Sequence, residues 1–291
     1  MALSSPGLVL AVPATFGFIK PQLDLIRRLG ATDFSAEDPG LKSEPGVTVK
    51  YPLSVVSKAL AFDDDTNNYL TGGNTEYGEL TATHFLQGYD MRGTDIDKGQ
   101  NAARIKQLFS MRAGTGISMA IQDVLRSSLD GTIASTGVLL DANPALADYD
   151  ALAADVTWLD KYNSALVVNG AEWAKIKVAL HSKNLSASTK SAAEELGFRD
   201  VIVLPGMTAR AVIVPVSSIG FMGGVPAIMA DYKEFGTETD EDSGLTLGIV
   251  VANDQKLNRI VVNGDLWFGS CALSANAAAT TAGIIKVGTE S

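Results

Sequence analysis

The chain has 291 residues, of which 46% are hydrophobic and 19% are charged. A chain of this length and composition buries a substantial core, which excludes an intrinsically disordered protein. The net charge of −10 repels nucleic acid phosphates from most of the surface, so a sequence-reading DNA-binding protein is also excluded. Cys271 is the only cysteine, so neither an intrachain disulfide nor a cluster of thiolate metal ligands can form.

The first 45 residues contain one short amphipathic stretch and are otherwise rich in Pro and Gly. Leu23, Ile26 and Leu29 fall near one helical face, and Pro21 suits a first helical turn. The apolar run at the N-terminus has no basic segment before it, so a signal peptide is not predicted. Such a segment buries little against itself, and we therefore expect residues 1–45 to form an arm that docks elsewhere.

Two extended segments follow, separated by a polar stretch. Residues 47–56 and 79–91 are rich in β-branched and aromatic residues and indicate strands. The acidic connection between them is far longer than the usual hairpin loop of about 2–5 residues. Because an isolated two-stranded ribbon is only marginally stable in water, we expect this hairpin to lie on another surface, such as that of another subunit.

A long helix is predicted over residues 94–131, where the apolar residues keep one helical phase. Asp95 and Asp97 are expected to cap its start. Gly114 and Gly116 lower the helix propensity without shifting the phase. This pattern predicts one long helix with a kink or a close packing contact at the two glycines.

The next hundred residues alternate between helix and strand. The segment "SALVVN" predicts a buried strand, and Asn169 with Glu172 predicts a capping box for the helix after it. A short helix closed by Gly197 comes next, then two apolar strands, "DVIVLPG" and "RAVIVPV", with a Pro-Gly turn between them. Residues 211–230 carry no charge and nominally reach a membrane-spanning length. Their prolines and glycines predict strand, turn and strand instead.

Three further strands are predicted at residues 232–239, 245–252 and 259–268. The turn between the first two contains the acidic octet "TETDEDSG". Counted from Asp240, an EF-hand ligand position falls on Gly244, which has no side chain to bind calcium. The position between two strands therefore favours a solvated hairpin turn over a metal site.

Catalytic residues do not form a recognisable motif. His84 and His181 are the only histidines, and neither has a further metal ligand or catalytic partner at a suitable spacing. The segment "GTGISMA" fails as a dinucleotide loop because Met119 occupies the third glycine position. It fails as a nucleophile elbow around Ser118 because the residues before it are helical rather than a strand. We expect no catalysis, no cofactor and no metal ion, with an α/β hydrolase that uses Ser118 as an alternative.

The order of the elements resembles the major capsid protein of tailed bacteriophages, whose capsid fold is shared with encapsulins. "WLDKYNSALVVNGAEWAKIKVAL" is similar to a family segment in which a strand precedes a helix. "YKEFGTETDEDSGLTLGIVVANDQKLNRIVVNGDLWFG" is similar to the closing hairpins of the family. The resemblance implies an α+β fold with an N-terminal arm at 1–45, an extended hairpin loop at 46–92, a peripheral-domain spine helix at 93–131, an axial domain at 132–230, peripheral-domain strands at 231–270 and a C-terminal segment at 271–291.

The resemblance further implies a structural, non-catalytic subunit made in the host cytoplasm and located in the virion capsid. Pentamers and hexamers of this subunit would form an icosahedral shell around double-stranded DNA, without sequence-specific binding and without a membrane. Because the chain is arm-like from Met1, we expect a separate scaffolding protein, together with a portal. No lysine lies between residues 59 and 97, so a covalent cross-link through the hairpin is not expected. The alternatives are an encapsulin-type nanocompartment shell and another tail or baseplate protein.

The resemblance also suggests which residues meet a neighbouring subunit. Arg104 and Arg112 on the long helix are candidate partners for the acidic run on the hairpin. The alternative that each of these side chains is merely solvated stays open. The hypothetical inter-subunit contact residues are Asp63, Asp64, Asp65, Tyr69, Tyr77, Arg104 and Arg112.

Overall fold

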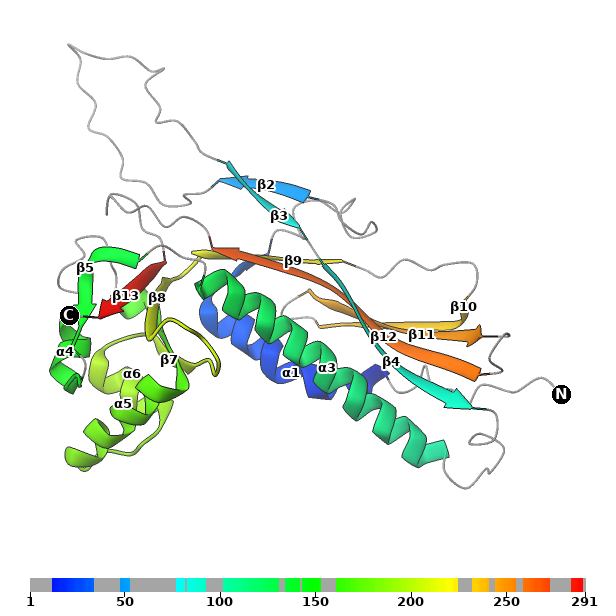
Figure 1. Cartoon of the computed structure of the whole chain (residues 1–291), viewed down its shortest axis with the longest axis horizontal. Helices are drawn as coiled ribbons and strands as arrows, with labels where there is room; N and C mark the ends of the chain where they lie inside the picture. Colours follow the sequence, from blue (N-terminus) through cyan, green and yellow to red (C-terminus); the bar gives the residue numbers. More distant parts are fainter. Residues whose placement is uncertain are drawn as a thin grey trace, which may run out of the picture.

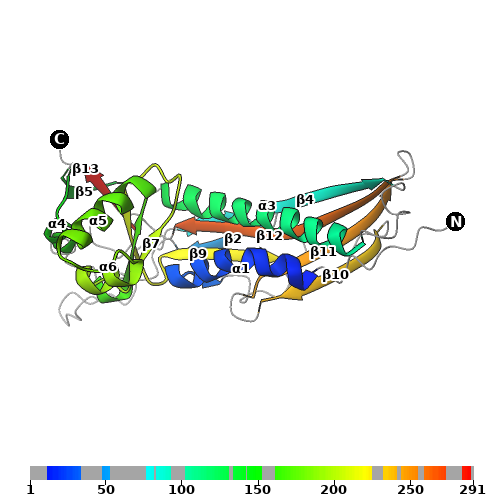
Figure 2. The ribbon, with the colours of Figure 1, turned by 90° about the horizontal axis from the view of Figure 1, so that it is seen from below.

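Two bodies make up the described part of the chain, a layer of two helices on a sheet and an α/β body at one end of it (Figure 1). The two views agree that the helices lie side by side along the sheet (Figure 2). The computed structural model describes residues 12–33, 48–52, 77–81, 83–92, 102–130, 134–141, 143–152, 161–224, 232–240, 244–254, 259–272 and 284–289.

The main sheet is built around the long strand β12 (Arg259–Ala272). One edge of β12 pairs with β11 (Thr246–Asp254), which pairs in turn with β10 (Tyr232–Thr239), and both pairings are antiparallel. The other edge is shared by β4 (Thr83–Arg92) and β9 (Ile219–Gly224), and the short β1 (Thr32–Asp33) lies parallel to β9. The three strands predicted near the C-terminus are therefore confirmed, with β12 extending to Ala272.

Helix α3 (Ala102–Asp130) runs along one face of this sheet. Its residues Ile117, Ile121, Leu125 and Leu129 recur every four positions and are fully buried. This spacing places one apolar stripe on the sheet, where it packs in the same core as Phe268. The prediction of one long helix is confirmed, while its predicted capping residues at 95 and 97 lie outside the described residues.

Helix α1 (Val12–Leu29) lies beside α3 and corrects the expectation that this segment docks away from its own core. Phe16 and Ile19 are buried with the downstream apolar residues of the same helix. Pro21, expected in the first turn, stands inside the helix. An interior proline costs about 3 kcal/mol or more, and burial of two large apolar side chains upstream of it offsets that cost. Helix α1 therefore begins well before Pro21, where the sequence pattern alone predicts its first turn.

The α/β body contains a five-stranded mixed sheet. One of its inner strands, β6 (Ser164–Val168), is buried along its whole length, as predicted. The strands, in sheet order, are β5 (Ala134–Leu140), β13 (Ile285–Thr289), β8 (Ala211–Pro215), β6 and β7 (Asp200–Val203). A short 3₁₀ turn (Lys161–Asn163) precedes β6, and the helices are α4 (Leu146–Ala151), α5 (Gly170–Ser182) and α6 (Thr189–Leu196).

Several local predictions for this body are confirmed. Helix α6 ends at Gly197, whose φ of 69° is the left-handed conformation that glycine adopts without strain. The uncharged segment that begins at residue 211 contains the two strands β8 and β9, as expected from its prolines and glycines. A bilayer-crossing helix is absent from the described residues. The C-terminal stretch, which the sequence left unassigned, supplies β13 between β5 and β8.

The predicted hairpin is present as a separate ribbon of two strands. Strand β2 (Thr48–Pro52) pairs antiparallel with β3 (Tyr77–Thr81). Only residue 82 separates β3 from β4, so the ribbon continues out of the main sheet (Figure 1). The strand predicted at residues 79–91 is divided between β3 and β4: its first residues pair with β2 as expected, whereas β4 joins the main sheet beside β12. The surface on which the ribbon lies stays a prediction.

Candidate assembly surfaces and the joint between the two bodies

The C-terminal end of α3 is tied to the α/β body by the carboxylate of Asp130. Both of its oxygens accept from the backbone N–H of Thr208 at 3.0 Å, and Oδ1 accepts from the N–H of Ala209 at 2.9 Å. Partial burial opposes ionisation of Asp130, but these N–H donors outweigh it and lower its pKa. A carboxylate at a helix C-terminus is unfavourable for the helix dipole. Its position here is explained by the loop that it holds.

The C-terminal end of α1 is tied to the same body by Arg28. Its guanidinium donates from Nε to Asp200 Oδ2 at 2.6 Å and from Nη2 to Oδ1 at 2.9 Å. In the other direction, Arg199 Nη2 donates to the backbone oxygen of Arg28 at 2.6 Å. The hydrogen bond to Asp200 raises the pKa of Arg28 despite partial burial. These paired contacts fix the position of α1 against β7.

An apolar core continues through this joint. Buried residues of the α/β body pack in one cluster with the buried faces of α1 and α3 and with the main sheet. The two bodies are therefore packed together rather than connected by a linker. The buried residues that the α/β body contributes to the shared cluster are Ala165, Val167, Ile202, Leu204, Met207, Ala209, Val212, Val214 and Ile284.

Glu172 on α5 is the centre of a buried polar network, and its side chain is only 1% exposed. Arg210 donates to both of its oxygens at 3.0 Å, and the hydroxyl of Tyr149 on α4 donates to Oε1. The predicted capping box is only half formed. Asn169 Oδ1 accepts from the N–H of Glu172 at 2.8 Å, but the N–H of Asn169 donates to the backbone oxygen of Arg210. The carboxylate turns inward because the buried guanidinium needs an anion.

This network joins four elements of the α/β body. Arg210 also donates to the backbone oxygens of Leu140 at 2.9 Å and Asp141 at 2.8 Å, at the end of β5. Burial opposes ionisation of Glu172, yet the hydrogen bonds from Arg210 and Tyr149 lower its pKa. Burial and the adjacent carboxylate raise the pKa of Tyr149. The network therefore stays ionised at neutral pH and holds α4, α5, β5 and β8 together.

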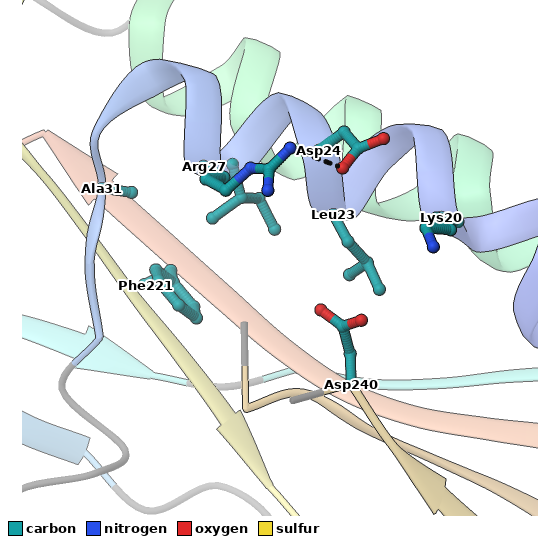
Figure 3. Close-up of a pocket in the computed structure, with 8 residues that line it drawn as sticks. Lys20, Leu23, Asp24, Arg27, Ala31, Phe221 and Asp240 are labelled. Atoms are coloured by element: carbon teal, nitrogen blue, oxygen red, sulfur yellow. Dashed lines mark hydrogen bonds and ion pairs between the residues drawn. The ribbon is translucent and has the colours of Figure 1, made fainter. Parts of the chain in front are cut away.

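Asp240 and Gly244, the described residues of the turn between β10 and β11, belong to the acidic octet, and Asp240 faces α1 of its own chain across a pocket (Figure 3). The N–H of Asp240 donates to the oxygen of Leu245 at 3.0 Å, and the N–H of Gly244 donates to the oxygen of Asp240 at 2.8 Å. The predicted hairpin turn is confirmed. Within the described residues, no group of acidic, His or Cys side chains could hold a metal ion. A pocket of about 130 Å³ separates the turn from the helix and is lined by Lys20, Leu23, Asp24, Ile26, Arg27, Ala31, Phe221 and Asp240.

The outer side of the helix layer carries a row of exposed apolar side chains, here named the α1–α3 strip. It consists of Phe18 on α1, 41% exposed, and Leu108, Met111 and Met119 on α3, which are 41%, 47% and 59% exposed. At the middle of the strip the helices touch. A Cβ on Gly114 would lie 2.5 Å from Cβ of Phe18. The close packing contact expected at this glycine is confirmed.

Few of the hypothetical inter-subunit residues can be placed. Tyr77 begins β3, opposite Pro52 of β2. Arg104 lies in the first turn of α3, and Arg112 is exposed one turn after Leu108. The remaining four, Asp63, Asp64, Asp65 and Tyr69, lie outside the described residues, so the proposed pairing stays a prediction.

The candidate catalytic residues are far from the geometry that their chemistry needs. Ser118 lies in the middle of α3, whereas a nucleophile elbow is a sharp turn from strand to helix. His84 lies on β4 opposite Trp267 of β12. His181 is exposed in the last turn of α5. The helical setting of Ser118 contradicts the hydrolase alternative.

Sequence reasoning missed the residues of the joint and of the buried network. The charged residues of the joint lie near the ends of their helices or strands, and the sequence around each of them is typical of an exposed surface. These residues are Arg28, Asp130 and Asp200. A carboxylate at a helix C-terminus was the one available signal, since the helix dipole disfavours it.

No family model matches the chain, and no curated protein matches it. Among solved structures, a virus-like particle from Pyrococcus furiosus is 12% identical and aligns over 95% of this chain and 97% of its own, with a TM-score of 0.50. The chain has the capsid fold. The capsid of Ralstonia phage GP4 is 12% identical, with 88% and 86% covered and a TM-score of 0.45. The procapsid of satellite phage P4, including its size determination protein, is 9% identical, with 94% and 98% covered and a TM-score of 0.45.

The fold prediction made from the order of elements is therefore confirmed, and the chain is an α+β protein of the capsid fold. The alignment with the virus-like particle protein covers nearly all of both chains, so it includes both bodies of this structure. At 12% identity this likeness concerns the fold.

Proposed function

We propose that the chain is the major capsid protein of a tailed phage and assembles into an icosahedral shell around double-stranded DNA. One observation carries the proposal. The fold aligns with that of a virus-like particle protein over 95% of this chain and 97% of the other. The resemblance to the capsid-protein family implies shell formation, and a structural, non-catalytic role follows from that implication.

The β2–β3 ribbon supports assembly on physical grounds. A ribbon of two strands is only marginally stable alone, and this one extends from the main sheet as a separate two-stranded sheet. A neighbouring subunit would supply the surface on which it lies. Repeated contacts of this kind, each burying more than about 1,000 Å², close a shell when symmetry relates them. The net charge of −10 keeps such a wall from adhering to packed DNA.

The test is the size of the purified full chain, measured by sedimentation velocity and negative-stain electron microscopy. Closed particles of megadalton mass are the expected result, either alone or when a scaffolding protein from the same genome is co-expressed. Tubes or rings would favour a tail or baseplate protein. A monomer of 30.5 kDa under both conditions would overturn the proposal.

A nanocompartment shell is the second candidate, because the protein that aligns at a TM-score of 0.50 is named a virus-like particle. The two candidates differ in what the particle encloses. Particles isolated from their natural source and treated with nuclease would retain double-stranded DNA if the chain is a phage capsid protein. They would contain protein cargo and no protected DNA if the chain forms a compartment. A separate scaffolding protein and a portal belong to the phage proposal alone.

Contacts between subunits are proposed at Asp63, Asp64, Asp65, Tyr69, Tyr77, Arg104 and Arg112. The acidic run on the hairpin would meet the basic residues of a neighbouring α3, since unlike charges favour one register of docking. The variant Asp64→Lys is expected to reduce the yield of particles, and adding Arg104→Glu is expected to restore it. Glu194→Lys, on the exposed side of α6, is the control reversal. Equal yields from all variants would contradict the pairing.

A further inference from the structure

A pocket of about 400 Å³, here named the α5 pocket, lies between α5 and the segment that leads into α4. Its volume is within the range of about 300–1,000 Å³ that is usual for small-molecule sites. One wall follows α5 from Ala174 through Val178 to Ser182, and Pro144 belongs to the other wall. Val178 is 70% exposed, although the same helix buries Ile176 in the core. Packing of the core therefore does not explain the apolar wall of this pocket.

Two side chains with N–H donors, Lys175 and Asn143, complete the α5 pocket. Lys175 Nζ lies 3.4 Å from Oε2 of the buried Glu172. Arg210 donates to the same Glu172 and to the backbone oxygen of Asp141. Asn143 follows Asp141 by two residues and is within about 7 Å of it along the chain. Both donors therefore lie at the end of the pocket that is nearest the buried network.

The charges at this end do not cancel. Glu172 is the acidic residue of α5, and it is shared by Arg210 at 3.0 Å and by Lys175. Two positive charges and one negative charge leave a net charge of +1 in this cluster. On α4, Asp148 is already bonded to the backbone N–H of Ala145 at 2.6 Å. The α5 pocket thus combines apolar walls with excess positive charge at one end, which an amphiphilic anion would complement.

We propose that the α5 pocket binds an aliphatic carboxylate, with its carboxylate at Lys175 and Asn143 and its alkyl chain along Val178. The wall on α5 is about 12 Å long from Ala174 to Ser182. An extended alkyl chain of about eight to ten carbons has a similar length, because carbon–carbon bonds are about 1.5 Å long. Such a ligand goes beyond the shell function, which neither requires it nor predicts it.

Two other occupants fit the α5 pocket less well. A nucleic acid would neutralise the positive charge, but its phosphates would leave the apolar walls without a partner. A second copy of the chain would need a broad apolar patch, since stable interfaces bury about 800 Å² on each partner. Val178 is the one large apolar side chain exposed on α5. A single alkyl chain in a concave site matches this small apolar surface better.

The test is isothermal titration calorimetry with the full chain, as unassembled subunits and as particles. The probes are octanoate, decanoate and decylammonium, each below the concentration at which it forms micelles. We expect decanoate to bind about tenfold more tightly than octanoate, because two further methylene groups are buried. Decylammonium has the same chain and the opposite charge, and it should bind at least about tenfold more weakly than decanoate.

The variants locate the binding site. Lys175→Gln should weaken binding of decanoate about tenfold without weakening that of decylammonium, because only the anion uses this charge. Val178→Asp should weaken decanoate at least about tenfold, since it places a carboxylate on the apolar wall. Lys190→Gln makes the same change in net charge on α6, where the side chain is 86% exposed, and should change nothing. Thermal unfolding by circular dichroism checks that each variant is folded.

Any of the following results would overturn the inference. Equal binding of decanoate and decylammonium would remove the role of charge, and an unchanged affinity in Val178→Asp would remove the pocket. Binding that appears only when micelles are present would mean adventitious association with a detergent. Loss of particles in Val178→Asp, with decanoate affinity unchanged, would reassign the pocket to a contact between copies. Particles that form but bind no decanoate would refute this inference and leave the shell proposal standing.

Discussion

A pair of glycine substitutions tests whether α1 is packed on α3 as a permanent part of the subunit. Gly17 and Gly114 are both inside helices, so replacing either by Ala raises the helix propensity by about 1 kcal/mol. A Cβ at Gly17 would have no atom within 4 Å. A Cβ at Gly114 would lie 2.5 Å from Cβ of Phe18 and 2.7 Å from the backbone oxygen of Thr15.

These distances predict different effects of the two substitutions on the free energy of unfolding. Gly17→Ala is expected to stabilise the subunit by up to about 1 kcal/mol, because nothing opposes the gain in propensity. At Gly114 one of the two close atoms belongs to the backbone, so α1 must move away from α3. Overpacking of this kind costs about 1–3 kcal/mol, which cancels or exceeds the gain. The two variants should therefore differ by about 1–3 kcal/mol in free energy of unfolding.

Urea unfolding of the unassembled subunit, followed by circular dichroism, measures this difference as a shift in the midpoint. Amide hydrogen exchange over residues 12–29 gives a second reading, since displaced helix exchanges faster. Equal stabilisation by both substitutions would show that α1 does not lie on α3 at this glycine. That result would also separate Phe18 from the α1–α3 strip.

Three further expectations concern the polar contacts. Glu172→Ala leaves the guanidinium of Arg210 buried without its anion, and should lower the free energy of unfolding by about 3 kcal/mol in a urea titration. Asp130→Ala should cost about 1 kcal/mol and speed amide exchange at Thr208, whereas Asp130→Asn keeps an acceptor and should cost less. Both carboxylates have a lowered pKa, so their stabilisation is present above their ordinary values of 4.5 and 3.8 and is lost as the pH falls through the lower folded values. The urea concentration at the unfolding midpoint should therefore decrease as the pH is lowered below about 4.5. This decrease should be smaller in Glu172→Ala, and an equal decrease in that variant and the parent chain would show that Glu172 does not contribute to it.

The spacing of apolar residues was sufficient to predict those helices and strands whose buried residues follow the repeat of the helix or strand itself. The long helix was predictable because its apolar residues share one phase, and β6 was predictable because it is apolar throughout. Gly197 and the octet turn followed from local turn chemistry. In each of these cases the deciding interactions are close in sequence, so the sequence contains the evidence for them.

Contacts between distant segments were not predictable in the same way. The start of α1 was not predictable because proline suits the first turn of a helix and destabilises its interior, and only packing on α3 outweighs that preference. The half-formed box at Glu172 was missed because Arg210, which redirects the carboxylate, is 38 residues away. The bond between Arg28 and Asp200 spans 172 residues. No local pattern distinguishes these side chains from solvated ones.

The location of the shared core implies which part of the subunit changes on assembly. A hinge motion between the two bodies would expose Ile202, Leu204 and other buried members of the common cluster, at about 1.5–3 kcal/mol for each large side chain. In the β2–β3 ribbon, β2 pairs with β3 alone among the described strands, and β3 also lies near β9 and β12 where it leaves the main sheet.

We therefore expect assembly to increase the protection of amide hydrogens in residues 48–52 and 77–81 and to leave Thr208 and Ala209 unchanged. Hydrogen exchange measured on subunits and on particles tests this difference, because the joint amides are already held by Asp130 in the lone chain. Increased protection at Thr208 and Ala209 without any at the ribbon would contradict this expectation. It would show that assembly changes the joint between the two bodies instead.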